Sequence, residues 1–152
     1  MTESLDDHLR ADHERLDLLL ERIRRDVEVN DRSVVAAARE FSKGLRRHIS
    51  FEEESLFPAL KGVAGRPSDR AFESLLIDHA VILEHLDLLL QLVERGDSAA
   101  ARPVADKLEI YLQGHNREEE SGVYRDAERL IPERDRATLI AKLPAAAGGT
   151  SS

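Results

Sequence analysis

Apolar residues recur at intervals of three and four along four stretches of the chain, with charged and polar residues between them. These stretches cover residues 4–28, 33–60, 69–95 and 99–130. Each predicts an amphipathic helix, because a helix with this spacing presents one apolar face. A weaker pattern over residues 133–143 predicts a short C-terminal helix. On the third helix the predicted buried face comprises Phe72, Leu76, Leu83, Leu86, Leu90 and Val93.

Short polar breaks separate these four stretches, and no strand pattern is present. Short connections make consecutive helices antiparallel neighbours. The sequence therefore predicts an all-α fold, an up-down-up-down four-helix bundle with a short C-terminal helix. We expect this bundle to occupy residues 1–143 and residues 144–152 to form a disordered tail. Pro58 is expected to end or kink the last turn of the second helix.

The chain also repeats itself. The segment DHERLDLLL at Asp12 resembles DHAVILEHL at Asp78, and HISFEEESLF at His48 resembles HNREEESGVY at His115. The histidines of the second copy follow those of the first by 66 and 67 residues. Each half is thus predicted to be a helical hairpin with a lone histidine on its first helix and a His-x-x-x-Glu on its second.

The repeated residues are candidate metal ligands. Residues four apart lie on the same helix face, so each His-x-x-x-Glu presents an imidazole and a carboxylate together. At about 100° per residue, these pairs and the lone histidines fall within the apolar arcs of their helices. A buried charge is costly unless it is paired, and a metal ion commonly compensates it. The candidates are His13, His48, Glu52, His79, His115 and Glu119.

Position along the helices supports the same site. His13 lies about 15 residues before the first break and His48 lies about 15 residues into the second helix, so the two meet at one level. Any one histidine alone is more often a core residue than a ligand, and acidic runs are usually solvated faces. Three observations together favour a metal site: the candidate side chains point inward, they lie at a common level along the helices, and their pattern is repeated in the two halves of the chain. His85 is predicted to lie on the surface or flank, and Tyr111 to pack in the core.

Composition and charge exclude several other functions. The chain has no cysteine, which excludes disulfides, thiolate zinc sites, iron–sulfur clusters and covalent c-type haem. Its net charge of −8, without a basic stripe, argues against a nucleic-acid partner. Neither a signal peptide nor a membrane span is apparent, so we expect no membrane association and a cytoplasmic location. Nothing in the sequence identifies a protein partner.

The motifs DH, HISFEE, DH and HNREEE, in this order, resemble the hemerythrin-like, HHE cation-binding family over about residues 4–130. The resemblance implies a non-haem di-iron protein that binds or reacts with oxygen, peroxide or nitric oxide. Imidazole and carboxylate donors suit iron, zinc or manganese rather than calcium. The ligands implied by the resemblance are His13 and His48 for one iron, His79 and His115 for the other, and Glu52 and Glu119 as bridges.

The sequence departs from the oxygen-carrying members of that family. Those carriers place two histidines one turn apart on the third helix, whereas Leu75 and Leu83 stand four residues before and after His79. Their second carboxylate is an aspartate five residues past the histidine, whereas the inward one here is Glu119, at four. Both irons are then expected to keep exchangeable positions, held by water or a bridging oxo or hydroxo group. We therefore expect a reactive centre rather than a reversible oxygen carrier.

Three other interpretations remain open at this point. The chain could be a non-enzymatic iron sensor or store, an iron-centre repair protein, or a structural bundle whose core histidines are satisfied by hydrogen bonds. Metal content separates the last of these from the others. Turnover of peroxide or nitric oxide separates a reactive centre from a sensor or store.

Overall fold

A computed structural model describes residues 4–143, and over that range the chain is all-helical, as predicted, without a strand. The predicted tail, residues 144–152, lies outside the described residues. The long helices are α1 (Leu5–Glu28), α2 (Val34–Phe51), α4 (Asp69–Glu94) and α5 (Ser98–Ser121). The shorter elements are the π-helical turn η1 (Glu52–Leu56), α3 (Phe57–Lys61), α6 (Val123–Leu130) and α7 (Glu133–Lys142).

Side-chain caps fix where three of the long helices begin. Ser4 Oγ accepts a hydrogen bond from the Asp7 amide at 2.9 Å, and Ser68 Oγ and Asp97 Oδ1 cap α4 and α5 in the same way. Such caps satisfy amides that the first helical turn leaves without a partner. Gly96 adopts a φ of 78° between α4 and α5, a left-handed conformation that glycine takes without strain.

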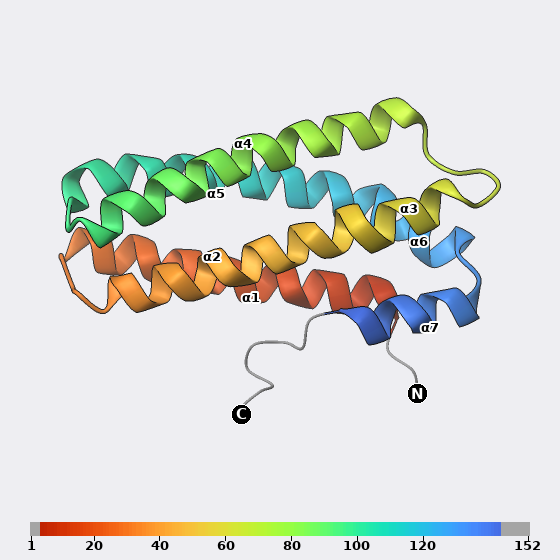
Figure 1. Cartoon of the computed structure of the whole chain (residues 1–152), viewed down its shortest axis with the longest axis horizontal. Helices are drawn as coiled ribbons and strands as arrows, with labels where there is room; N and C mark the ends of the chain where they lie inside the picture. The colour runs from red at the N-terminus through yellow and green to blue at the C-terminus, as the bar shows by residue number, and fades with distance from the viewer. Residues whose placement is uncertain (1–3, 144–152) are drawn as a thin grey trace.

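The long helices lie side by side, and each packs against two others (Figure 1). Helix α1 contacts α2 and α5, and α4 contacts the same two helices from the other side. This arrangement is compatible with the predicted four-helix bundle. Helices α6 and α7 lie near the end of the assembly where α1 begins, and both contact α1 (Figure 1).

The core consists of two apolar clusters, one toward each end of the long helices. Along α1, Leu9 belongs to one cluster and Leu16 to the other, and His13 lies between them. Along α4, His79 lies in the same way between Leu75 and Ile82. The predicted ligands therefore occupy a polar layer between two apolar ones.

Pro58 does not end the second helical segment. The chain widens into the π-turn η1 just before it, where the Phe57 amide donates to the Glu52 carbonyl, and then continues as α3 to Lys61. A proline inside an α-helix clashes with the carbonyl four residues earlier and donates no hydrogen bond. A π-turn accommodates one extra residue in the helix. The predicted kink is therefore replaced by a local widening.

The predicted fourth helix, residues 99–130, is broken at Gly122 into α5 and α6. Gly122 has φ −119° and ψ −98°, outside the helical region. A Cβ atom on Gly122 would lie 2.9 Å from the Glu118 carbonyl oxygen, so this turn requires glycine. The error arises because Val123 and Leu130 continue the apolar spacing across the break.

The buried face of α4 also differs from the predicted one. Leu76 is 38 % exposed, whereas Leu75, Ile82 and Leu89 are buried. Leucine and isoleucine occur on more than one face of this helix, so the apolar spacing alone is compatible with more than one choice of buried face.

Candidate metal centre

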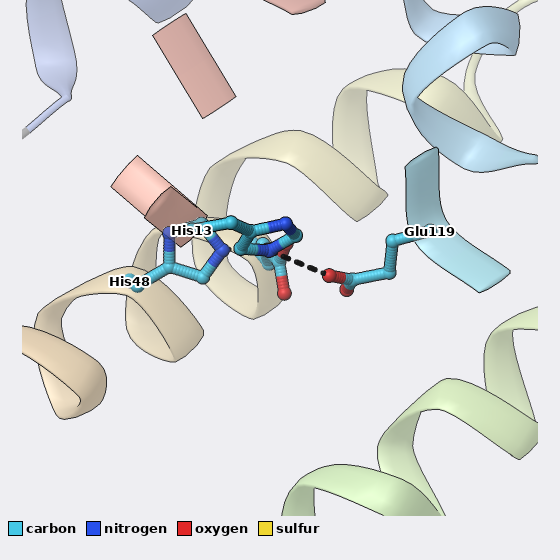
Figure 2. A group of neighbouring side chains, drawn as sticks. His13, His48 and Glu119 are labelled. Atoms are coloured by element: carbon cyan, nitrogen blue, oxygen red, sulfur yellow. Dashed lines mark hydrogen bonds and ion pairs between the residues drawn. The ribbon is translucent and has the colours of Figure 1, made fainter. Parts of the chain in front are cut away.

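The six predicted ligands meet in the polar layer between the two apolar clusters. None of them is more than 6 % exposed. Figure 2 shows His13, His48 and Glu119 pointing toward one another, with His13 Nε2 lying 3.3 Å from Glu119 Oε1. These three residues come from α1, α2 and α5, so their convergence depends on the packing of the helices.

The six side chains form two overlapping groups, in each of which the ligand atoms lie within 4.8 Å of one another. The first donor group consists of His13, His48, Glu52 and Glu119. The second donor group consists of Glu52, His79, His115 and Glu119. The two glutamates belong to both groups, whereas each histidine belongs to one.

Each shared glutamate turns one oxygen toward each group. Glu52 Oε2 lies 3.1 Å from His48 Nε2, and Glu52 Oε1 lies 3.0 Å from His79 Nε2. Glu119 Oε1 faces His13, and Glu119 Oε2 lies 3.0 Å from His115 Nε2. This is the disposition that a carboxylate needs in order to bridge two cations.

Four further carboxylates, which we call the outer carboxylates, contact the other ring nitrogen, Nδ1, of each histidine. Their distances to Nδ1 are 2.7 Å for Asp12 and His48, 2.8 Å for Glu120 and His13, 2.6 Å for Glu53 and His79, and 3.0 Å for Asp78 and His115. A carboxylate accepts a hydrogen bond, so each Nδ1 carries a proton and each Nε2 points inward, where a cation can take the place of any proton on it. Metal-binding histidines are commonly oriented in this way.

Sequence reasoning assigned no role to the outer carboxylates. At about 100° per residue, Glu53 and Glu120 fall on the flanks of their helices and Asp12 falls at the margin of its apolar stripe, where acidic side chains are usually solvated. A signal was nevertheless present, because each outer carboxylate is adjacent in sequence to a predicted ligand: Asp12 to His13, Glu53 to Glu52, Asp78 to His79 and Glu120 to Glu119.

The buried charged groups of the centre strongly shift one another's pKa values. Burial lowers the pKa of His79, but close contacts with the carboxylates of Glu119 and Glu52, and their negative charges, outweigh it and raise the pKa to about 10. Burial raises the pKa of Glu119, but hydrogen bonds from His115, His13 and His79 hold it well below its ordinary value. Without a cation, the imidazole of His79 therefore keeps both of its ring protons at neutral pH.

Three buried atoms of the centre form no hydrogen bond of good geometry within the described residues: Glu52 Oε1, His79 Nε2 and Glu119 Oε2. They approach only other ligand atoms, since Glu52 Oε1 lies 3.0 Å from His79 Nε2 and Glu119 Oε2 lies 3.0 Å from His115 Nε2. All three belong to the second donor group. A buried polar atom without a partner costs free energy that a bound cation recovers. The residues present therefore fit a metal ion.

The matching family model is the hemerythrin HHE cation binding domain, and it covers residues 4–127. The chain belongs to this family. The resemblance drawn from the repeated motifs is thereby confirmed, and cation binding is the property that the family carries. Comparison with curated proteins and with solved structures gave no match.

One further polar group in this HHE domain reaches the donor atoms. Tyr124, on α6, is fully buried, and its hydroxyl donates to Glu52 Oε2 at a very short distance and lies 3.1 Å from Glu119 Oε1. The same oxygen lies 2.9 Å from His13 Nε2 and 3.0 Å from His48 Nε2. Burial and the charges of both glutamates raise the pKa of Tyr124 well above its ordinary value, so without a cation it is a neutral phenol.

The two irregular turns of the HHE domain place equivalent aromatic residues against its histidines. Phe57 follows Glu52 by five residues, as Tyr124 follows Glu119. The Phe57 ring stacks on His79 at 6.0 Å, and the Tyr124 ring stacks on His13 at 5.3 Å. The π-turn η1 precedes Phe57 and the break at Gly122 precedes Tyr124, so both halves deform at the same place in the repeat.

Tyr111 and His85 lie outside both donor groups. His85 lies on the flank of α4, half-buried, with its ring 4.9 Å from that of Tyr111. The prediction that Tyr111 packs in the core is wrong, because its side chain is 41 % exposed. Tyr111 instead lines an open cavity of about 410 Å³ that reaches Asp78 and His115.

A second, much smaller cavity of about 10 Å³ adjoins the centre on the side of the other apolar cluster. His13, His48 and His115 line it together with apolar residues such as Leu45 and Ile82. A volume of this size holds about one water molecule. Only a very small ligand fits beside the histidines here.

The described part of the HHE domain contains no helix of the length and apolarity that crossing a membrane requires.

Proposed function

We propose that this HHE domain is a non-haem di-iron protein with a four-helix-bundle fold. One ion is held by His13 and His48 and the other by His79 and His115, with Glu52 and Glu119 bridging them. The donor atoms that support this assignment lie within 4.8 Å of one another in each group, and the two groups share both glutamates.

The observation that carries the proposal is that the two carboxylate oxygens of each glutamate face different donor groups. Glu52 and Glu119 are fully buried, and each has one oxygen near a histidine of the first group and the other near a histidine of the second. Two negative charges at the core of a helical protein are unfavourable without compensation. A pair of divalent ions satisfies both oxygens of both carboxylates, whereas a single ion leaves half of them unused.

The donor chemistry restricts which ions fit. Four imidazole nitrogens and two carboxylates suit iron, zinc or manganese and disfavour calcium, which takes oxygen ligands. The outer carboxylates increase the basicity of the imidazoles, which strengthens their binding to a transition metal. Among these ions we propose iron, in keeping with the family to which the chain belongs.

We further propose that the centre binds or reacts with oxygen, peroxide or nitric oxide. An iron pair supplies electrons and exchangeable coordination positions to such ligands. Neither Leu75 nor Leu83 offers a nitrogen donor beside His79, so this chain does not fill those positions as an oxygen carrier does. The cavity of about 10 Å³ beside His13, His48 and His115 holds about one water molecule, which disfavours substrates larger than such small ligands.

Mixing the anaerobic, ferrous-loaded protein with oxygen, hydrogen peroxide and nitric oxide in separate stopped-flow experiments tests this proposal. We expect rapid optical changes with at least one of them and consumption of that ligand over repeated additions. An oxygen adduct that returns to the ferrous spectrum under vacuum, without peroxide turnover, would instead identify an oxygen carrier. No change with any of the three would leave a sensor or store as the function.

A further inference from the structure

The hydroxyl of Tyr124 is the feature that distinguishes the two donor groups. It contacts all four ligand atoms of the first group: His13 Nε2 at 2.9 Å, His48 Nε2 at 3.0 Å, Glu119 Oε1 at 3.1 Å, and Glu52 Oε2 at a shorter distance. It contacts no histidine of the second group among the hydrogen bonds of the described chain. This oxygen therefore belongs geometrically to one metal position only.

We propose that the phenol oxygen of Tyr124 is a fifth protein ligand of the metal ion at the first donor group, and that the second donor group has no counterpart, so that the two ions are chemically unequal. This inference rests on the proposed di-iron function. It adds a ligand outside the repeated His and His-x-x-x-Glu pattern and assigns the more open coordination sphere to the second group.

The contact distances are those of a shared coordination sphere. Metal–nitrogen and metal–oxygen bonds in such sites measure about 2.0–2.2 Å, and two ligands at right angles on bonds of that length lie about 3.0 Å apart. A ligand of an octahedral ion has four such neighbours. The Tyr124 oxygen has four neighbours at about this distance, and all four are ligand atoms of the first group.

The packing of Tyr124 keeps its oxygen in this place. The side chain is fully buried and belongs to the apolar cluster that includes Leu9, Leu56 and Phe72, and its ring stacks on His13. Moving the ring away from the centre would open a cavity of aromatic size in that cluster, which is strongly unfavourable. An ion entering the first group therefore meets the hydroxyl rather than displacing it.

The internal repeat supplies the comparison for the second group. Phe57 occupies the position that corresponds to Tyr124, since it follows His48 by nine residues as Tyr124 follows His115. Its ring stacks on His79, but it has no hydroxyl to present to the ion. The three buried atoms without a hydrogen bond of good geometry are His79 Nε2 and the glutamate oxygens that face the second group, where no hydroxyl is available to them.

Two other features make the second group the more accessible one. Arg15 and Arg10 hold the outer carboxylates of the first group, Asp12 and Glu120, whereas no arginine pairs with Glu53 or Asp78 within the described residues. The open cavity of about 410 Å³ reaches His115 of the second group. The cavity that adjoins His13 and His48 of the first group measures only about 10 Å³ and also reaches His115. A small ligand is therefore expected to bind at the second ion, and the first ion to stay closed by Tyr124.

Binding of the metal ion by Tyr124 requires the loss of a proton but no electron transfer. The phenol O–H bond breaks, a bond forms between the phenolate oxygen and the metal ion, and the proton leaves to solvent water. With a ferric ion, a phenolate ligand produces a visible charge-transfer absorption that imidazole and carboxylate ligands do not produce.

The test compares ferric-loaded wild-type protein with Tyr124→Phe and Tyr111→Phe, the latter a control at the only other tyrosine of the chain. We expect the phenolate absorption, and tyrosinate vibrations on resonance Raman excitation within it, in the wild type and in Tyr111→Phe but not in Tyr124→Phe. Mössbauer spectra of the wild type should show two distinct iron sites of equal area.

Several results would overturn the inference. The wild type could hold two ferric ions and show no phenolate absorption, the absorption could persist in Tyr124→Phe, or a single Mössbauer site could account for all the iron. If Tyr124→Phe did not fold, the wild type and Tyr111→Phe would still decide. Iron content separates this inference from the proposed function, because two ions without a phenolate signal refute only the ligation by Tyr124.

Discussion

Replacing Asp12 by asparagine is a sensitive test of how the outer carboxylates support the centre. Asp12 Oδ2 lies 2.7 Å from Nδ1 of His48, and the Asp12 side chain is 16 % exposed. The other outer carboxylates are 29–37 % exposed. Asparagine keeps the size of the side chain and removes its charge. Because Asp12 is the most shielded of the four, water compensates least for the loss.

The expected effect is a loss of metal affinity at the first donor group alone. Removing such an outer partner costs about 10–100-fold in affinity, which is about 1.4–2.8 kcal/mol at 1.4 kcal/mol per factor of ten. We expect Asp12→Asn near the upper end of that range. His48 belongs only to the first group, so affinity at the second should change by less than a factor of about three, the usual scatter of such effects.

Anaerobic competition between the protein and a ferrous chelator gives the two stepwise affinities. Glu14→Gln is the matched control, because it removes one charge from the exposed face of the same helix. The reasoning would be refuted if Asp12→Asn bound iron as the control does. It would also be refuted if both steps weakened equally, since the hydrogen bond would then not be specific to one ion.

Three further predictions concern the whole centre. Glu52→Gln and Glu119→Gln should each lower iron content at both groups, whereas Glu54→Gln, an exposed neighbour, should retain two ions by elemental analysis. Iron at a hundredfold excess over Kd should add about 2.7 kcal/mol per ion. For two ions this corresponds to a rise of about 10–20 °C in Tm, measured by calorimetry before and after chelation. In the metal-free protein, His79 has its pKa raised to about 10 from an unfolded value near 6.5. Its contribution to the free energy of unfolding should therefore be complete below about pH 6.5 and disappear as pH rises through 10, which urea titrations of chelated protein should show.

The helices and the six candidate ligands could be predicted from the sequence because both follow from local periodicity. His48 and Glu52, and likewise His115 and Glu119, share a helix face by their spacing alone. The duplication then indicates that the two hairpins present the same residues to one another. Nothing about tertiary packing is required for these steps.

The contribution of Tyr124 could not be predicted, because it depends on a break in the helix. Tyr124 follows His115 by nine residues, and at about 100° per residue a straight helix would place it about 180° away, on the opposite face. The break at Gly122 changes that direction. The π-turn η1 lies at the corresponding place before Phe57, nine residues after His48.

The outer carboxylates escaped prediction for a different reason. Glu53 and Glu120 lie on the flanks of their helices, where an acidic side chain is ordinarily solvated. Their partners, His79 and His13, lie on other helices, so only the packing of the helices shows that each carboxylate holds an Nδ1 hydrogen. Tyr111 shows the converse error, since its position within an apolar arc did not bury it.

An anaerobic titration of the metal-free, untagged protein with ferrous iron tests the central claim most directly. The account predicts saturation at two ions per chain, because Glu52 and Glu119 each direct one oxygen to each donor group. Saturation at one ion, or no binding above that of a Glu52→Gln, Glu119→Gln double variant, would contradict it.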